Sequence, residues 1–236
     1  MSPESDSFVG GGPTSKSSAP RTLYRPVGLL ELNLILDSDA RAFPPRLPQQ
    51  PIFYPVLNFE YAEQIASKWN PFDAASGFAG YVTDFDVDAD FVRLFEVKLV
   101  GEAAKHRELW IPANQLPQFN AHLRSRIRTR AAFYGPAYLG PTPLPGALEG
   151  ERAEAQLTTL SDILHYSVFE FATEIEANWK LVLANLGFWS ATAPEKQGLT
   201  REARGATLAA IEKVWKQKFG DLPLPQGTLL QSTSSS

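Results

Sequence analysis

The 236-residue chain contains no cysteine, so disulfide bonds, thiolate metal ligands and a cysteine nucleophile are all excluded. Histidine is scarce as well. The only three, His106, His122 and His165, lack the HExxH spacing of a catalytic zinc site. We therefore expect no metal centre in this protein.

Long apolar runs are also missing. No stretch reaches the roughly 18 consecutive apolar residues that would span a bilayer. The first 20 residues are rich in Ser, Gly and Pro and lack the apolar segment of a secretory signal. An excess of positive charge is absent too, since the net charge of −4 argues against a general binder of nucleic acids or membrane surfaces. Together these absences predict a cytoplasmic protein without a membrane partner.

The composition divides the chain into five parts. Hydrophobic residues make up 44% of the chain, which is enough to bury a core. The division predicts a disordered tail at 1–20, an α+β domain at 21–135, a Pro/Gly-rich linker at 136–152, a helical subdomain at 153–225 and a second disordered tail at 226–236.

The most informative stretch of the first domain is residues 52–66. An aromatic-rich strand at 52–57 runs into Asn58, a good N-cap, because its side-chain oxygen can accept from a free amide of the first helical turn. In the helix that follows, Ala62, Ile65, Ala66 and Trp69 share one face, which we expect to pack inward. The rest of the domain is predicted as a helix at 29–37 and strands at 22–25, 77–85, 91–99, 108–111 and 126–133.

The second part of the chain has a helical pattern. Apolar residues keep helical spacing from Leu157 to Val182, which predicts one long helix, and a second helix is expected at about 200–219. Two such helices cannot bury both apolar faces alone. We therefore expect them to pack on each other and on the first domain.

Two runs of charge have a period of two. Asp84, Asp86, Asp88 and Asp90 would share one face of an extended segment, either as a solvated strand end or as a cation site. Similarly, Arg124, Arg126, Arg128 and Arg130 would share one face of a strand. These arginines either grip a phosphate-bearing substrate or form a charged edge strand that resists association, and the second interpretation is favoured.

The order of features in the first domain resembles a known superfamily. An Arg in the first strand is followed by the FY-x6-YA-x2-IA corner, a glycine-bearing strand and then Glu-Leu-Trp-Ile-Pro. This order resembles the ADP-ribosyltransferase fold. Over about residues 22–135 the chain also resembles a microbial family catalogued as "ADP-ribosylation/crystallin J1", through LYRPVGLLEL, FPPRLPQQPIFYPVLNFEYA, GYVTDFDVDADF and ELWIPANQLPQFN.

The resemblance implies an α+β, ADP-ribosyltransferase-like mixed β domain that uses NAD as its substrate. Glu108 would be catalytic and would hold the ribose, and Tyr54 would stack on nicotinamide, with Tyr61 as its neighbouring alternative. Arg25 would pair with the pyrophosphate, and Arg46 is a second candidate for that role. The residue two before Glu108 is His106, where arginine-directed transferases carry Glu or Gln, so the pattern is closer to Arg/His–Tyr–Glu variants.

Three functions are therefore carried forward. The first is transfer of ADP-ribose from NAD to an unknown protein or nucleic-acid acceptor. The second is a catalytically inactive nucleotide-binding or protein-interaction module on the same scaffold. The third is an ADP-ribosyl hydrolase, as the "crystallin J1" half of the family label suggests, although those hydrolases are all-helical and hold magnesium. The enzyme hypothesis expects Arg25, Tyr54 and Glu108 to converge on one cleft.

Overall fold

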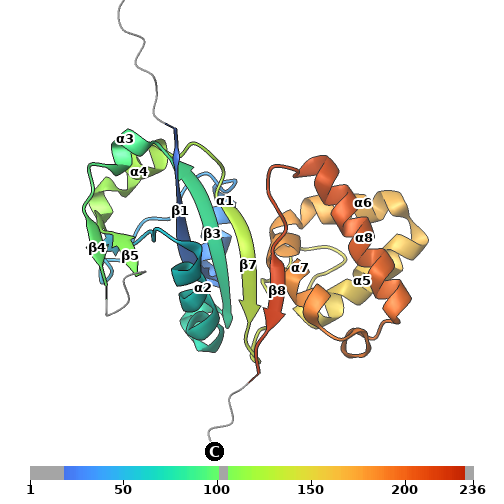
Figure 1. The fold of residues 1–236 in the computed structure, drawn as a ribbon. Helices are drawn as coiled ribbons and strands as arrows, with labels where there is room; N and C mark the ends of the chain where they lie inside the picture. Colours follow the sequence, from blue (N-terminus) through green and yellow to red (C-terminus); the bar gives the residue numbers. More distant parts are fainter. Residues whose placement is uncertain (1–18, 101–105, 232–236) are drawn as a thin grey trace, which may run out of the picture.

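The computed structural model describes residues 19–100 and 106–231, and its centre is a four-stranded mixed sheet (Figure 1). The strand order is β1 (Arg21–Gly28), β3 (Ala79–Val87), β7 (Arg128–Tyr134) and β8 (Gln226–Leu229). The pairs β1–β3 and β3–β7 are antiparallel, whereas β8 pairs with β7 in parallel. The protein is therefore mixed α/β, with a sheet that draws strands from both ends of the chain.

A second ladder adjoins β1. In it, β2 (Ile52–Phe53) pairs with β6 (Ile111–Pro112), and β5 (Arg107–Leu109) pairs with β4 (Val97–Leu99). Val56 links the ladder to the main sheet, because it forms one bridge to Tyr24 and another to Glu108. Hydrogen bonding therefore continues from β4 through β5 and Val56 into β1. The predicted strand at 52–57 is regular only at Ile52–Phe53.

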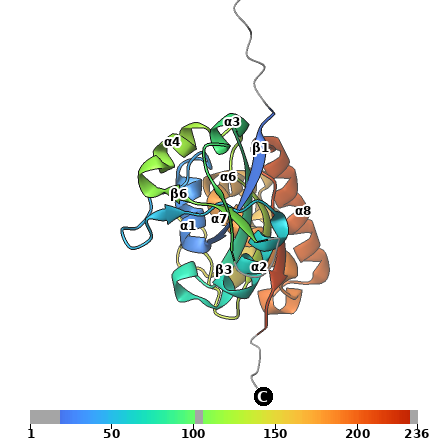
Figure 2. The same ribbon diagram turned by 60° about the vertical axis from the view of Figure 1, so that its left-hand side comes forward.

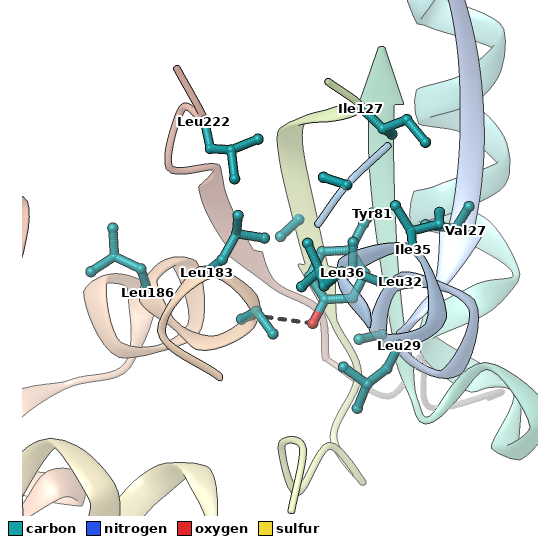
Figure 3. Packing of buried hydrophobic residues seen from close by; sticks show 14 of the residues in the cluster. Val27, Leu29, Leu32, Ile35, Leu36, Tyr81, Ile127, Leu183, Leu186 and Leu222 are labelled. Carbon is teal, nitrogen blue, oxygen red and sulfur yellow. Dashed lines mark hydrogen bonds between the residues drawn. The ribbon is translucent and has the colours of Figure 1, made fainter. Parts of the chain in front are cut away.

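The two faces of the sheet carry different helices. On one face, α1 (Leu29–Asp37) and α7 (Trp179–Ala191) share the main apolar core, where Tyr81 of β3 lies among Leu32, Leu36 and Leu183 (Figure 3). The Tyr81 hydroxyl donates to the Ala184 carbonyl across 3.1 Å. On the other face, α2 (Phe59–Lys68) covers a smaller cluster. Its buried members are Val56, Ala62, Ala66, Val82 and Phe133.

The chain between β7 and β8 is mostly helical. Its helices are α5 (Ala153–Tyr166), α6 (Val168–Ala177), α7 and α8 (Arg201–Lys218). They gather on the β8 side of the sheet, whereas α3 (Ala89–Val92) and α4 (Leu116–Ala121) lie on the β1 side (Figures 1 and 2). In the part of the chain that the structure describes, none of the helices is long and apolar enough to cross a bilayer.

The predicted long helix from Leu157 to Val182 is wrong, because the chain breaks twice within it. Ser167 adopts an extended conformation and caps α6 by accepting from the amide of Glu170. Asn178 then separates α6 from α7. The second predicted helix is confirmed as α8, which Thr200 caps. Helix α1 spans the predicted residues 29–37, and Asn58 caps α2 by accepting from the Tyr61 amide.

Four further expectations need correction. Residues 91–99 do not form one strand, because Asp88 caps the short helix α3 and only Val97–Leu99 is extended. Trp69 ends α2 with about half of its surface exposed instead of packing inward. The segment 136–152 is no free linker, since Tyr138 and Leu148 are buried in the main core. The predicted tail at 226–236 begins with β8, and its residues 232–236, like residues 1–18 of the first tail, lie outside the described residues.

Candidate functional site

Glu108 lies at the centre of a polar and aromatic group on the α2 face of the sheet. Its strand neighbours on the same face are His106 and Trp110, and across the ladder it faces Val56 on one side and Lys98 on the other. The group that we call the Glu108 patch consists of Tyr54, Tyr61, Lys98, His106, Glu108 and Trp110. Sequence reasoning missed His106, Lys98 and Trp110. The alternation of His106, Glu108 and Trp110 along one strand was the available signal.

The Glu108 carboxylate is held in place and almost enclosed. Only 9% of the residue is exposed, and the indole Nε1 of Trp110 donates to its Oε1 across 2.7 Å. Trp110 also contacts the Tyr54 ring edge-on, with ring centres 5.7 Å apart. The arrangement provides a fixed carboxylate with an aromatic wall on one flank.

The other flank is formed by α2. The Tyr61 ring stacks on His106 with centres 4.2 Å apart, and His106 Nε2 is 3.1 Å from Oε1 of Gln64. Burial, followed by the negative charge of Glu108, raises the pKa of Tyr61. The phenol therefore stays protonated beside the carboxylate and can donate a hydrogen bond to a ligand.

Arg25 lies on the opposite face of the sheet. Side chains alternate along β1, so Tyr24, which bridges to Val56, shares the face of Glu108, and Arg25 does not. The Arg25 guanidinium forms a bidentate ion pair with Glu31 of α1 at 2.8 and 3.0 Å and lies 4.7 Å from the centre of the Phe53 ring. The expected convergence of Arg25, Tyr54 and Glu108 on one cleft is therefore wrong for the Arg25 side chain, which reaches only the Tyr54 carbonyl, at 3.3 Å.

Arg46 lies beside Arg25. Its Nη1 is 3.6 Å from Oε1 of Glu31, and its Nη2 donates to Gln50. Burial and then the positive charge of Arg25 lower the pKa of Arg46, whereas Glu31 and Tyr54 act in the opposite direction. Next to this pair is a pocket of about 330 Å³ between α1 and the proline-rich loop. Tyr54 thus adjoins both groups: its ring is in the Glu108 patch and its carbonyl touches Arg25.

The two charge runs pair with each other in part, and the four arginines do not share one strand face, because β7 begins only at Arg128. Arg126 pairs instead with Asp39 and Asp221, and Asp90 pairs with Arg93. Asp84 accepts from Nε of both Arg128 and Arg130, at 2.6 and 2.7 Å, and Asp86 accepts from Arg128 at 2.9 Å. Arg124 pairs with Asp88. Strand β8 pairs with β7 only from Ala131 to Tyr134, so Arg128 and Arg130 lie on a part of β7 that has no described strand on its other side, as the edge-strand interpretation expects. We call these contacts the Asp–Arg ladder. Its carboxylates are committed to arginines, and the described residues contain no group of acidic and histidine side chains arranged to hold a metal ion.

The ion pairs of the Asp–Arg ladder predict that the protein loses stability in acid. Burial alone would raise the pKa of Asp86, but hydrogen bonds from Arg128, Thr22 and Ser125 outweigh it and lower the pKa. A lowered folded-state pKa gives stability that is complete above the unfolded value of about 3.9 and is lost as the pH falls through the folded value. We expect Asp86→Asn to be less stable than the wild type at pH 7, and the difference in the free energy of unfolding to narrow as the pH falls below about 3.9, as measured by urea unfolding. A difference that is the same at pH 7 and pH 3 would contradict the prediction.

No family model, no curated protein and no solved structure matches the chain. The geometry of the Glu108 patch is therefore the feature from which a function can be inferred.

Proposed function

We propose that the chain is an NAD-dependent, ADP-ribosyltransferase-like enzyme that passes ADP-ribose to a protein or nucleic-acid acceptor. The observation that carries the proposal is the enclosed Glu108 carboxylate, which Trp110 holds at 2.7 Å beside the rings of Tyr54 and Tyr61. Flat aromatic surfaces next to a fixed negative charge suit a nicotinamide ring attached to a ribose that becomes positively charged during the reaction.

The chemistry assigns a role to each residue of the patch. When the bond between nicotinamide and ribose breaks, nicotinamide leaves as a neutral molecule with the bonding electron pair, and the ribose becomes an oxocarbenium-like cation. Glu108 would stabilise that cation and hold the ribose hydroxyl. Tyr54 or Tyr61 would stack on nicotinamide. The acceptor's oxygen or nitrogen then bonds to the ribose carbon and gives up its proton.

The arginines receive a revised role in this proposal. Because Arg25 is paired with Glu31 behind the sheet, it would act as a positioning residue that holds the Tyr54 backbone. Arg46, which lies between Glu31 and Gln50, remains the candidate for the pyrophosphate of NAD. NAD would then extend past Tyr54 from one face of the sheet to the other, with its nicotinamide at the Glu108 patch and its pyrophosphate at Arg46.

The ion pair of Arg25 also favours a second candidate function. A guanidinium whose Nε and Nη2 donate to Glu31 and whose Nη1 donates to the Tyr54 carbonyl has little capacity left for a pyrophosphate. A nucleotide-binding or protein-interaction module without catalysis would tolerate that arrangement. No observation favours the hydrolase, because the acids that would hold magnesium are those paired in the Asp–Arg ladder.

Release of nicotinamide from NAD tests the proposal. We expect the wild type to release nicotinamide and Glu108→Gln to do so at least about 100-fold more slowly, because one group aimed at the developing charge is lost. Glu60→Gln, an exposed carboxylate at the start of α2, is the matched control and should keep the wild-type rate. Equal rates for the wild type and Glu108→Gln would remove Glu108 from the mechanism.

Calorimetric titration with NAD separates the two candidates. Binding together with release supports the transferase, and binding without release supports the inactive module. If the protein neither binds NAD nor releases nicotinamide, the transferase and the nucleotide-binding module are both overturned.

A further inference from the structure

Strand β4 forms an open edge of the extended sheet. It pairs with β5, and among the described strands it has no partner on its other side, where it is the outermost strand at the left of Figure 1. At the other end of the sheet, α7 packs closely on the face of β8, where a Cβ at Gly227 would fall 2.2 Å from the Gly187 backbone. An open edge presents backbone groups that can pair with another chain.

The backbone of Val97 points toward that open side. The amide of Val100 donates to the His106 carbonyl across 2.9 Å, and Lys98 faces Glu108 in the ladder. Hydrogen-bonded and non-bonded pairs alternate along antiparallel strands, so the N–H and C=O of Lys98 point toward β5 and those of Val97 point away. Val97 thus offers one donor and one acceptor to a neighbouring strand.

The side chains along β4 are complementary to those of β4 in a second copy of the chain. Val97 and Leu99 lie on one face and are 42% and 61% exposed. On the other face, Lys98 and Glu96 form an ion pair of 2.6 Å. If two copies pair in antiparallel orientation about Val97, each Val97 faces Val97 of the other copy and each Lys98 faces Glu96 of the other copy. Opposite charges directly across a strand pair stabilise it, and like charges destabilise it.

We propose that β4 is a self-association edge, through which two copies of this chain pair in antiparallel orientation about Val97. The backbone groups of Val97 and Leu99 both point outward, and the two Lys98–Glu96 pairs select the register that is centred on Val97. A register one residue further along would set Lys98 against Lys98. The second copy is therefore the occupant that the charge pattern favours over an unrelated peptide.

The dimer is expected to be weak. Three strand residues and a few exposed apolar side chains cover less than the roughly 1,200 Å² that stable interfaces bury. It should therefore dissociate on dilution, and sedimentation velocity from about 1 to about 200 µM should show the sedimentation coefficient rise with concentration. A wild type that stays monomeric over this range overturns the proposal.

Charge exchange tests the register. Lys98→Glu turns both cross-copy ion pairs into like-charge pairs and should raise the dimer dissociation constant by about tenfold or more. The double variant Glu96→Lys with Lys98→Glu restores both pairs and should dimerise like the wild type. Circular dichroism checks that each variant is folded.

Mixing makes the test specific. The double variant carries the exchanged charges, so in a mixed pair the wild-type Glu96 faces a second carboxylate and the wild-type Lys98 faces a second ammonium group. Each protein should therefore pair with itself and exclude the other, as native mass spectrometry of the mixture can measure. Statistical mixing would show that another surface or register holds the copies together, and would overturn the assignment.

Discussion

Gly80→Ala is expected to lower the melting temperature by about 6 to 12 °C. Gly80 lies in β3 where α2 crosses the sheet. A Cβ at this position would fall 1.9 Å from the carbonyl oxygen of Ala66 and 2.7 Å from its carbonyl carbon. Because both atoms belong to the helix backbone, α2 must move away from β3, which would cost about 3 kcal/mol. Thermal unfolding followed by circular dichroism measures the loss.

The same substitution at Gly205 is the matched control. Gly205 lies inside α8, and a Cβ there would meet nothing within 4 Å. Alanine has the higher helix propensity, so Gly205→Ala should stabilise the protein by about 0.5 to 1 kcal/mol. Equal effects at the two positions would contradict the close packing of α2 on β3.

Asp84→Ala is the second large expected effect, a loss of about 2 to 3 kcal/mol in the free energy of unfolding. Asp84 is only 4% exposed and accepts from both Arg128 and Arg130. Its removal leaves the Arg128 guanidinium with Asp86 as its remaining partner and with Nε unpaired. Since the side chain of Arg130 is 43% exposed, water can replace its contact, which keeps the loss below that of a fully buried pair. Urea unfolding at pH 7 gives the value.

Asp90→Ala provides the contrast within the same run of acids. Asp90 is 61% exposed and pairs only with the exposed Arg93, so its loss should change stability by less than about 0.5 kcal/mol. A similar loss at both positions would mean that Asp84 is no more important to folding than a surface carboxylate.

Features that depend on residues close together in the chain, such as helix caps and buried helix faces, could be predicted from the sequence. Asn58 and the alanines of α2 defined a cap and a buried face, and both formed as expected because each depends on neighbours a few residues away. Hydrophobic spacing was less reliable between Leu157 and Val182. The spacing continued through Ser167 and Asn178, although a serine that can cap a new helix interrupts the hydrogen bonding.

Local sequence patterns did not predict which residues face each other across the sheet. The arginine and aspartate runs were each treated separately, although the shared period of two is the signal for a cross-strand ladder. Likewise, Arg25 and Glu108 appeared to belong to one site until the bridges at Val56 fixed which face each side chain occupies. A shift of one residue moves every side chain of a strand to the other face, and the sequence alone does not fix that register.

The position of β8 has a consequence for synthesis of the chain. β7 ends at Tyr134, yet the strand that pairs with it in parallel begins at Gln226. While the chain emerges from the ribosome, one side of β7 therefore remains exposed until four helices have been made. During that interval the unpaired side of β7 is an exposed edge with which another chain could pair, and the helices are synthesised before the sheet can be completed.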